Sequence, residues 1–202
     1  MRRPTTYCGG ESVAGRIFAF DRVTSPPPDI YCDSSFILDV LYTDRPSLDF
    51  YILGVDSKTT FWTSWLAVEE LTYVAFKGGI ARSKEYKAVE KERKAQGKTL
   101  DPKRFAREFP AEYQKVAGKA RSNASKMYTS IANLHVDIRA IDQAHLAGVC
   151  RFAAKIFGEH DLESADAFHI AIALAGGTTN MASNDGHFRA GLDMVDVYTS
   201  RP

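Results

Sequence analysis

Residues 30–38 of the chain run Ile30-Tyr31-Cys32-Asp33-Ser34-Ser35-Phe36-Ile37-Leu38. The first three residues predict a short buried strand, and the second apolar run predicts a helix. Serine is favoured at a helix N-cap, so we expect this helix to begin at Ser34 or Ser35. Asp33 therefore lies at a junction between a strand and a helix.

Strands and helices are expected to alternate along the rest of the chain. Residues 59–63 are β-branched or aromatic and predict a strand. Ser64 is expected to cap the helix that follows, and Gly78-Gly79 to end it. The pattern of residues 47–58 does not distinguish helix from strand. Further strands are expected at 16–20, 179–183 and 194–198, and further helices at 81–96, 105–141 with a break near Pro110, 144–157 and 164–175. This alternation predicts an α/β fold with a parallel sheet flanked by helices.

Length and composition indicate one domain. The chain has 202 residues, of which 45% are hydrophobic and 25% charged, enough for a full core. Pro26-Pro27-Pro28 separates an N-terminal extension, residues 1–29, from a domain spanning 30–202. The net charge of +1 conceals an asymmetry, because residues 77–126 hold 15 Lys and Arg against 6 Asp and Glu. We therefore expect an expanded basic helical segment at about 80–130, inserted into an acidic body.

Several classes of protein are excluded by missing patterns. The cysteines, Cys8, Cys32 and Cys150, are odd in number and widely spaced, so we expect no disulfide framework and a cytoplasmic location. The sequence contains no run of 18 apolar residues, so we expect no membrane span. The phosphate-binding loop of P-loop NTPases is absent, as is the Gly-x-Ser-x-Gly element of serine hydrolases.

Four acidic residues lie beside apolar runs rather than on evidently solvated faces. Asp33 and Asp185 follow predicted strands, and the carboxyl ends of parallel strands share one edge of a sheet, where ligands gather. Glu70 and Asp166 lie near the starts of helices that follow loops at this edge. Unpaired carboxylates beside a core are unfavourable, and a hard divalent cation such as Mg²⁺ or Mn²⁺ would stabilise them. The pattern favours metal-dependent phosphodiester chemistry.

Each acid also has an ordinary structural explanation. Asp33 suits a helix N-cap, Asp166 complements a helix dipole, Asp185 suits a tight turn, and Glu70, like Glu69, suits a solvated helix face. Glu69 and Glu70 compete for one position, and helical periodicity favours Glu70, which shares a stripe with apolar residues. Two histidines, His169 and His187, are candidate ligands or bases, although a helical histidine is more often a packing or hydrogen-bonding residue.

The four acidic motifs together resemble those of the PIN-domain nucleases, and in style the VapC-type toxins of bacterial toxin–antitoxin pairs. The matching segments are residues 30–35, 68–71, 164–171 and 182–188. Two departures are the length of this chain, with its extension and basic segment, and Ser183 where the family often has threonine. The resemblance implies RNA endonuclease activity that depends on Mg²⁺ or Mn²⁺, a homodimer, and an inhibitory antitoxin.

The resulting hypothesis assigns roles to particular residues. Asp33, Asp166 and Asp185 would hold the metal, with Glu70 as the fourth catalytic acid. Hydrogen bonds that orient these carboxylates would come from Ser34, Ser35, Ser183 and Asn184. RNA contact is assigned to basic side chains of the inserted segment: Lys84, Lys87, Lys91, Lys94, Lys98, Lys103, Arg104 and Arg107.

Other functions remain open at this point. The basic segment is also consistent with a solvated helical hairpin that contains pairs such as Glu90 and Lys94. A non-catalytic nucleic-acid- or protein-binding module on the same fold, or a DNA nuclease, is the alternative function. A haloacid-dehalogenase-type phosphohydrolase is disfavoured, because Ser35 stands where that class needs a second Asp. The number of metal ions is not determined by the pattern.

Overall fold

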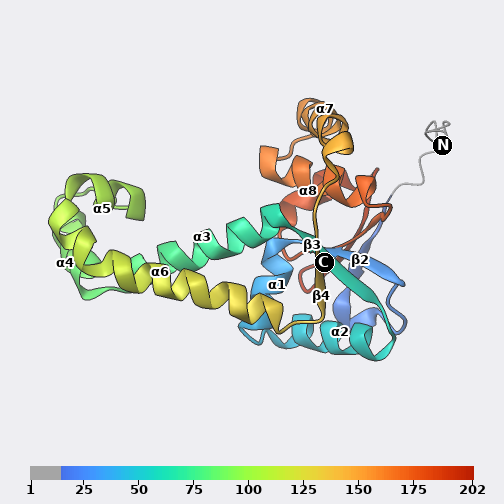
Figure 1. The fold of residues 1–202 in the computed structure, drawn as a ribbon, viewed down its shortest axis with the longest axis horizontal. Helices are drawn as coiled ribbons and strands as arrows, with labels where there is room; N and C mark the ends of the chain where they lie inside the picture. The colour runs from blue at the N-terminus through green and yellow to red at the C-terminus, as the bar shows by residue number, and fades with distance from the viewer. Residues whose placement is uncertain (1–14) are drawn as a thin grey trace.

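The computed structural model describes residues 15–202 and contains an α/β fold built on one parallel sheet. The six strands are β1 (Ile17–Ala19), β2 (Asp29–Cys32), β3 (Thr60–Ser64), β4 (Val136–Arg139), β5 (Asn180–Ala182) and β6 (Asp196–Thr199). Their order in the sheet is β1-β6-β5-β2-β3-β4, and each neighbouring pair is parallel. The predicted fold class is confirmed (Figure 1).

Helices flank this sheet and also extend away from it. In the described part of the chain they are α1 (Ser34–Leu41), α2 (Arg45–Asp56), α3 (Trp65–Ala81), α4 (Lys84–Ala95), α5 (Pro102–Glu108), α6 (Pro110–Ala132), α7 (Gln143–Glu159) and α8 (Ser164–Ala175). Two short 3-10 helices span Phe20–Arg22 and Gly186–Gly191. None of the helices in residues 15–202 is both long and apolar enough to cross a membrane.

The chain forms the edge strand β1 first and then crosses to β2 in the middle of the sheet. From β2 it continues to β3 and β4 on one side, and it returns to β5 and β6, which fill the space between β2 and β1. The strand order therefore reverses between β2 and β5, and a crevice outside the carboxyl ends of the strands forms at such a reversal. Cys32 pairs with Ala182 in this register, so Asp33 and Ser183 leave the sheet side by side.

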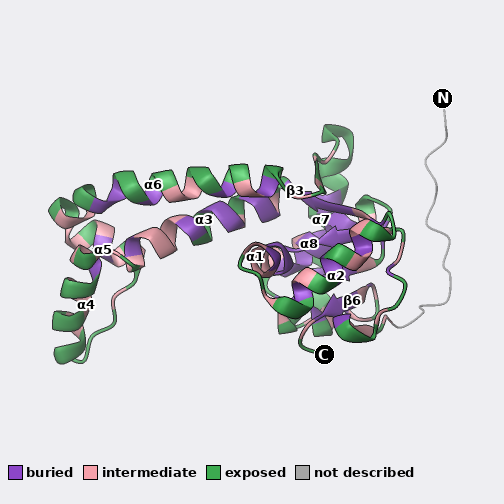
Figure 2. Ribbon diagram, turned by 90° about the horizontal axis from the view of Figure 1, so that it is seen from below, coloured by how far each residue is buried: buried purple, intermediate pink, exposed green. Residues whose placement is uncertain are grey.

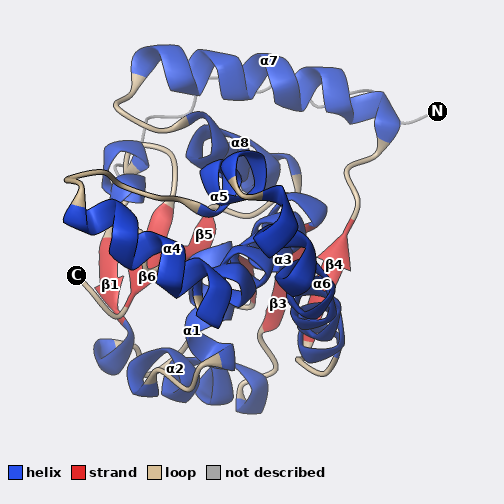
Figure 3. Ribbon diagram, turned by 90° about the vertical axis from the view of Figure 1, so that its left-hand side faces the viewer, coloured by secondary structure: helices blue, strands red, loops and turns tan. Residues whose placement is uncertain are grey.

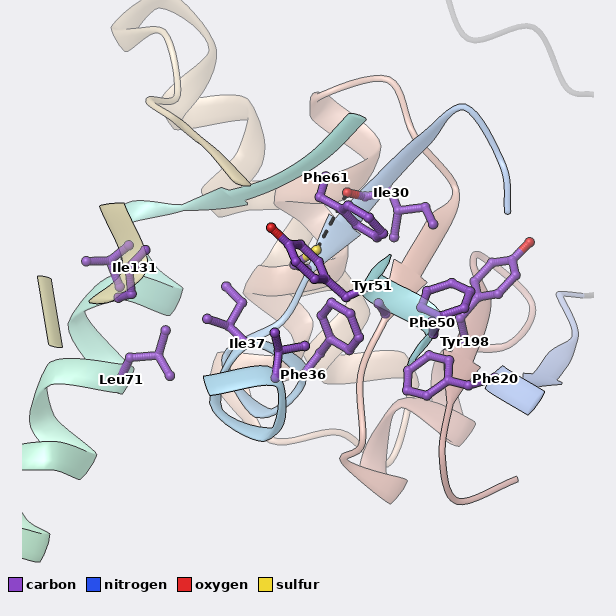
Figure 4. Close-up of a cluster of buried hydrophobic side chains, with 14 of the residues drawn as sticks. Phe20, Ile30, Phe36, Ile37, Phe50, Tyr51, Phe61, Leu71, Ile131 and Tyr198 are labelled. Carbon is purple, nitrogen blue, oxygen red and sulfur yellow. Dashed lines mark hydrogen bonds between the residues drawn. The ribbon is translucent and has the colours of Figure 1, made fainter. Parts of the chain in front are cut away.

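Side chains alternate between two hydrophobic cores on the opposite faces of the sheet. Along β2, Ile30 and Cys32 join one core whereas Tyr31 joins the other, as the period of two requires. Phe61 and Trp62 on β3 divide in the same way. Figure 4 shows the first core, where rings from α1, α2, β3 and β6 pack together. Fully burying an aliphatic or aromatic side chain contributes about 1.5–3 kcal/mol, so these two layers fix the sheet.

The expected basic segment forms a helical arm. Helices α3 and α6 pack along each other and lead away from the sheet to α4 and α5 (Figures 1 and 2). The outer part has its own small core, in which Tyr86 and Phe105 meet edge to face, 5.3 Å between ring centroids. Figure 2 shows that most of the arm's remaining surface is exposed or half-buried.

Three details of the predicted elements were wrong. Gly78-Gly79 does not end α3, which continues to Ala81, because Gly79 serves helix packing instead. A Cβ on Gly79 would lie 3.0 Å from the Cα of Ala120 in α6, so the missing side chain allows close approach. The first cap is Asp33 itself, whose side chain accepts a hydrogen bond from the Ser35 backbone N–H. Residues 136–139, expected within a helical region, form the edge strand β4.

Other predicted elements are confirmed. Ser64 caps α3, and its hydroxyl accepts from the backbone N–H of Ala67. Residues 17–19 of the predicted N-terminal strand form β1, which pairs with β6 and so extends the sheet of the main domain. The undecided segment 47–58 lies largely within α2, capped by Asp44. Cys8 lies outside the described residues.

Candidate metal centre

Four acidic side chains gather at the carboxyl ends of the neighbouring strands β2 and β5. Asp33 follows β2, Asp166 lies in the first turn of α8, and Asp185 follows β5 and caps a 3-10 helix. Glu70, in the second turn of α3, joins them through His169, whose Nε2 is 3.0 Å from Glu70 Oε2 and 3.5 Å from Asp33 Oδ1. The structure thus brings together acids that are up to 152 residues apart in sequence.

Asp33 is buried, and one of its oxygens is fully committed to hydrogen bonds. Its Oδ2 accepts from the Ser35 hydroxyl at 2.7 Å, the Ser183 hydroxyl at 2.9 Å and the Ser35 backbone N–H at 3.2 Å. Its Oδ1 has a longer contact, 3.4 Å, with the Ser34 hydroxyl. These donors fix the carboxylate and leave Oδ1 free to face His169 and a ligand. The N-cap role therefore coexists with an orientation suited to metal binding.

Asp166 has an unsatisfied carboxylate oxygen. Its Oδ2 is buried and has no hydrogen-bond partner among the described residues. Burial, followed by the negative charges of Asp185 and Asp33, raises the pKa of this carboxyl group to about 6. His187 Nδ1 lies 3.6 Å from that oxygen and 3.5 Å from Asp185 Oδ1, too far for a normal hydrogen bond. A cation beside Asp166 Oδ2 would stabilise this buried acceptor and the negative charges around it.

His169 is the residue whose importance the sequence understated. Its ring is buried, its Nε2 faces Glu70, and its Nδ1 lies 2.5 Å from the Tyr31 hydroxyl. Because Glu70 can only accept when ionised, Nε2 donates to it. Tyr31 donates to Nδ1 when the ring is neutral and accepts from Nδ1 in the imidazolium. The Ser64 hydroxyl, 2.9 Å from the Tyr31 oxygen, extends the chain of hydrogen bonds.

The charge state of His169 follows from its neighbours. Burial lowers the pKa of His169, but the hydrogen bond with Glu70 and the charges of Asp33, Glu70 and Asp166 outweigh burial, so the net shift is upward. The imidazolium that this favours stabilises the crowded carboxylates. His169 lies three residues after Asp166, so both side chains share one helix face. This spacing was the one signal in the sequence that linked His169 to the acidic site.

The ligand atoms that lie nearest one another differ from the predicted metal set. Asp33, Glu70 and His169 each offer a ligand atom within 4.8 Å of the others. The predicted set was Asp33, Asp166 and Asp185, in which the negative charges of Asp185 and Asp33 both act on Asp166. Both sets share Asp33, and the carboxylate-rich donors suit Mg²⁺ or Mn²⁺, with the imidazole favouring Mn²⁺ of the two.

Glu70, rather than Glu69, faces this centre. The Glu70 side chain is 30% exposed and contacts His169, whereas Glu69 is exposed. Three of the four predicted supporting residues, Ser34, Ser35 and Ser183, contact Asp33 directly.

Asn184 acts at a longer range than expected. Its side-chain amide donates to Asp39 at 2.7 Å and to Ser47 at 2.8 Å, and its oxygen accepts from Thr199 at 3.1 Å. It therefore ties the loop after β5 to α1, α2 and the C-terminal strand. Its own backbone N–H donates to the Ser35 hydroxyl at 2.9 Å, which links it indirectly to Asp33.

The basic residues nominated for RNA contact lie on the arm, and several are engaged internally. Lys94 pairs with Glu90 at 3.2 Å, and Arg104 and Arg107 both approach Glu108, at 3.1 and 3.7 Å. Lys103 lies over the ring of Tyr73. The other nominated lysines, Lys84, Lys87, Lys91 and Lys98, form no ion pair within residues 15–202.

The centre is a group of carboxylates at the carboxyl-end edge of a parallel sheet, with one histidine and one carboxylate oxygen that lacks a hydrogen-bond partner within residues 15–202. Such a group can hold a divalent cation beside a substrate that enters at the carboxyl ends of the strands. Comparisons of the chain with models of protein families, with curated proteins and with solved structures find no match.

Proposed function

We propose that the protein is a metal-dependent endoribonuclease of the PIN-domain type, and the toxin of a toxin–antitoxin pair. The observation that carries the proposal is the buried oxygen of Asp166, which lacks a partner beside Asp33, Asp185 and the Glu70–His169 pair. Clusters of this kind at the switch point of a parallel sheet suit Mg²⁺ or Mn²⁺. The order of the four acids along the chain adds the resemblance to PIN-domain nucleases.

Particular residues would hold the ion and the reacting groups. Asp33 offers Oδ1, Asp166 offers Oδ2, and the half-buried Asp185 lies close enough for its charge to act on Asp166, so these three would bind the cation. When bound, the ion lowers the pKa of a water molecule and neutralises charge on the phosphoryl oxygens. Glu70, partly exposed and hydrogen-bonded to His169, would orient that water and accept its proton.

His169 would hold Glu70 and Asp33 in position. Its Nε2 proton lies between the two carboxylates, and Tyr31 fixes the opposite ring nitrogen. A buried imidazole held at both nitrogens cannot rotate freely, so the geometry of the two acids is preserved. We therefore assign His169 a positioning role in the proposed reaction.

The partner predictions remain part of the proposal. Exposed apolar side chains of α7 support a protein partner, because Leu146, Phe152 and Phe157 are 45%, 39% and 54% exposed. A cavity of about 450 Å³ between α7 and α8 is lined almost wholly by apolar atoms, and Phe152 lies in its wall. We propose a homodimer through this cavity and its surroundings on α7, and inhibition by an antitoxin. The cytoplasmic location expected from the cysteines stays a prediction.

The direct test is cleavage of total cellular RNA by the purified protein with Mn²⁺ or Mg²⁺. We expect discrete fragments that disappear with EDTA and with Asp33→Asn. Asp161→Asn, an exposed acid upstream of α8, is the matched control and should cleave normally.

The same assay separates the rival functions. Single-stranded DNA of matched length, if cleaved faster than RNA, would favour a DNA nuclease. Absence of cleavage of either polymer, with no metal binding, would contradict the proposal and favour a binding module.

A further inference from the structure

A groove lined by basic side chains runs along α6, on the inner part of the arm. Two cavities, of about 540 and 270 Å³, adjoin one another and share Arg82 and Asn123 in their walls. The first lies where α3, α4 and α6 meet, and the second lies between α6 and the end of α1. They form one groove, which we call the α6 groove.

The α6 groove is lined by five cations. Arg82, Lys84, Lys115 and Lys119 line the first cavity, and Lys126 lines the second, which again includes Arg82. None of the five forms an ion pair within residues 15–202. Glu85, in the first cavity, offsets one positive charge. Unpaired cations collected along a concave surface attract a polyanion.

Helical periodicity explains how the groove arises. Lys115, Lys119, Asn123, Lys126 and Ser130 follow one another at intervals of three or four residues, so they share one face of α6. From the first to the last the helix rises about 22 Å, at 1.5 Å per residue. A nucleic-acid strand that advances 3.4 Å per nucleotide would place about six phosphates over this length.

An exposed aromatic ring lies at the inner end of the groove. Tyr42 lines the second cavity and is 59% exposed, so its face is open to a base that stacks on it. Polar Asn123 and Ser130 line the intervening wall. Cations for a backbone with an aromatic platform beside them match a single strand of nucleic acid better than an acidic peptide.

We propose that the α6 groove binds the phosphodiester backbone of single-stranded RNA at a distance from the metal centre. Asp33 caps the beginning of α1 and Tyr42 caps its end, so about 12 Å of helix separates the two sites. The choice of RNA as the ligand rests on the proposed function, whereas the existence of the basic groove does not depend on that function. The substrate is therefore an RNA that contacts both sites at once, either because it is long enough or because it is folded.

The groove differs from the lysine-rich run that the sequence suggested. Lys115, Lys119 and Lys126 lie outside that run, and only Lys84 belongs to both sets. Lys94, Arg104 and Arg107 of the run pair with acids of the arm. The groove thus gathers a different set of unpaired cations, most of them on α6 and at the end of α3.

Binding of a fluorescent 20-nucleotide oligouridylate, measured by anisotropy in EDTA at several salt concentrations, tests the proposal. The triple variant Lys115→Gln, Lys119→Gln, Lys126→Gln removes three groove charges. Each phosphate contact on a single strand contributes about 0.7 to the salt slope, so we expect the slope to fall by about 2 and affinity at 0.1 M salt to fall about ten- to a hundred-fold. The control triple Lys58→Gln, Arg151→Gln, Lys155→Gln removes the same charge from exposed sites elsewhere and should bind like wild type.

Rescue and substrate length complete the design. Arginine at the three groove positions should restore binding. The glutamine triple should cleave a four-nucleotide RNA as fast as wild type and a long RNA with a raised KM. Equal losses in the two glutamine triples, an unchanged salt slope, or an equal loss of binding to poly-glutamate would overturn the proposal. Failure of wild type to cleave any RNA would contradict the proposed function and leave the binding result as it stands.

Discussion

At the scale of single residues, Asp166 links the site to the stability of the fold. The raised pKa means that the folded protein binds this proton more tightly than the unfolded chain does, so without metal the stability falls as pH rises from about 4 through about 6. Above that range the buried charge destabilises the fold by on the order of 1–3 kcal/mol. A bound cation would reverse this effect.

Asp166→Asn should therefore stabilise the metal-free protein and abolish its response to metal. We expect a higher melting temperature than wild type in EDTA at pH 8, and no increase on adding Mn²⁺. Wild type should gain more from Mn²⁺ at pH 7.5 than at pH 5, because the proton competes with the ion below about pH 6. Thermal melting checks both points with Asp161→Asn as the control. A variant less stable than wild type in EDTA would contradict this account.

Tyr31→Phe tests the positioning of His169. Removing the hydroxyl leaves the buried Nδ1 of His169 without its partner 2.5 Å away, which should reduce stability by about 1–3 kcal/mol. Loss of a supporting hydrogen bond typically lowers metal affinity 10–100-fold, and we expect a decrease of that size. Denaturant unfolding and Mn²⁺ titration measure the two effects, with the exposed Tyr128→Phe as the control. Unchanged metal affinity in a destabilised Tyr31 variant would reduce Tyr31 to a packing role.

At the scale of elements, the contact between α3 and α6 depends on the absence of a side chain at Gly79. Gly79→Val would push β-branched atoms against the Ala120 backbone, where even a Cβ would be only 3.0 Å away. Overpacking of this kind reduces stability by about 1–3 kcal/mol. Gly118→Ala, on the same arm but facing open space, should instead stabilise α6 by about 0.5–1 kcal/mol. Denaturant midpoints distinguish the two, and equal effects would show that the helices do not pack as closely as described.

The elements differ in how far the sequence predicted them. The strands β2, β3 and β5 are buried and carry strong local patterns, so their positions were foreseen. The edge strand β4 was missed because its side chains are exposed or half-buried and Asp137 and Arg139 weaken its strand pattern. The end of α3 was misplaced because the sequence does not distinguish a glycine that allows close helix packing from a glycine that ends a helix. Only the partner helix distinguishes the two.

At the scale of the whole molecule, the sequence predicted that the four acids gather at one edge of the sheet, but it did not predict their geometry. Order along the chain and strand ends were enough to nominate Asp33, Glu70, Asp166 and Asp185 and to place them at one edge. The role of His169 depends on Tyr31, 138 residues away, and that contact follows only from the folded sheet. The α6 groove likewise depends on the meeting of α3, α4 and α6, three helices of the arm that Figure 3 shows.

The proposed homodimer is also a property of the whole molecule. Light scattering should give twice the chain mass of 22.4 kDa. Phe152→Asp would place a charge in the apolar cavity between α7 and α8 and should yield a monomer. Arg151→Asp, exposed on the neighbouring position, should remain dimeric. A monomeric wild-type protein would contradict the dimer while leaving the metal centre unaffected.

The central claim, that these carboxylates bind a divalent cation, is tested most directly by calorimetric titration of Mn²⁺ into wild type and Asp33→Asn at pH 7.5, in two buffers of different ionisation enthalpy. The account predicts saturable binding with proton release in wild type, because the ion displaces protons from Asp166 and His169, and at least tenfold weaker binding in the variant. Identical titrations of the two proteins, or no saturable binding by wild type, would contradict it.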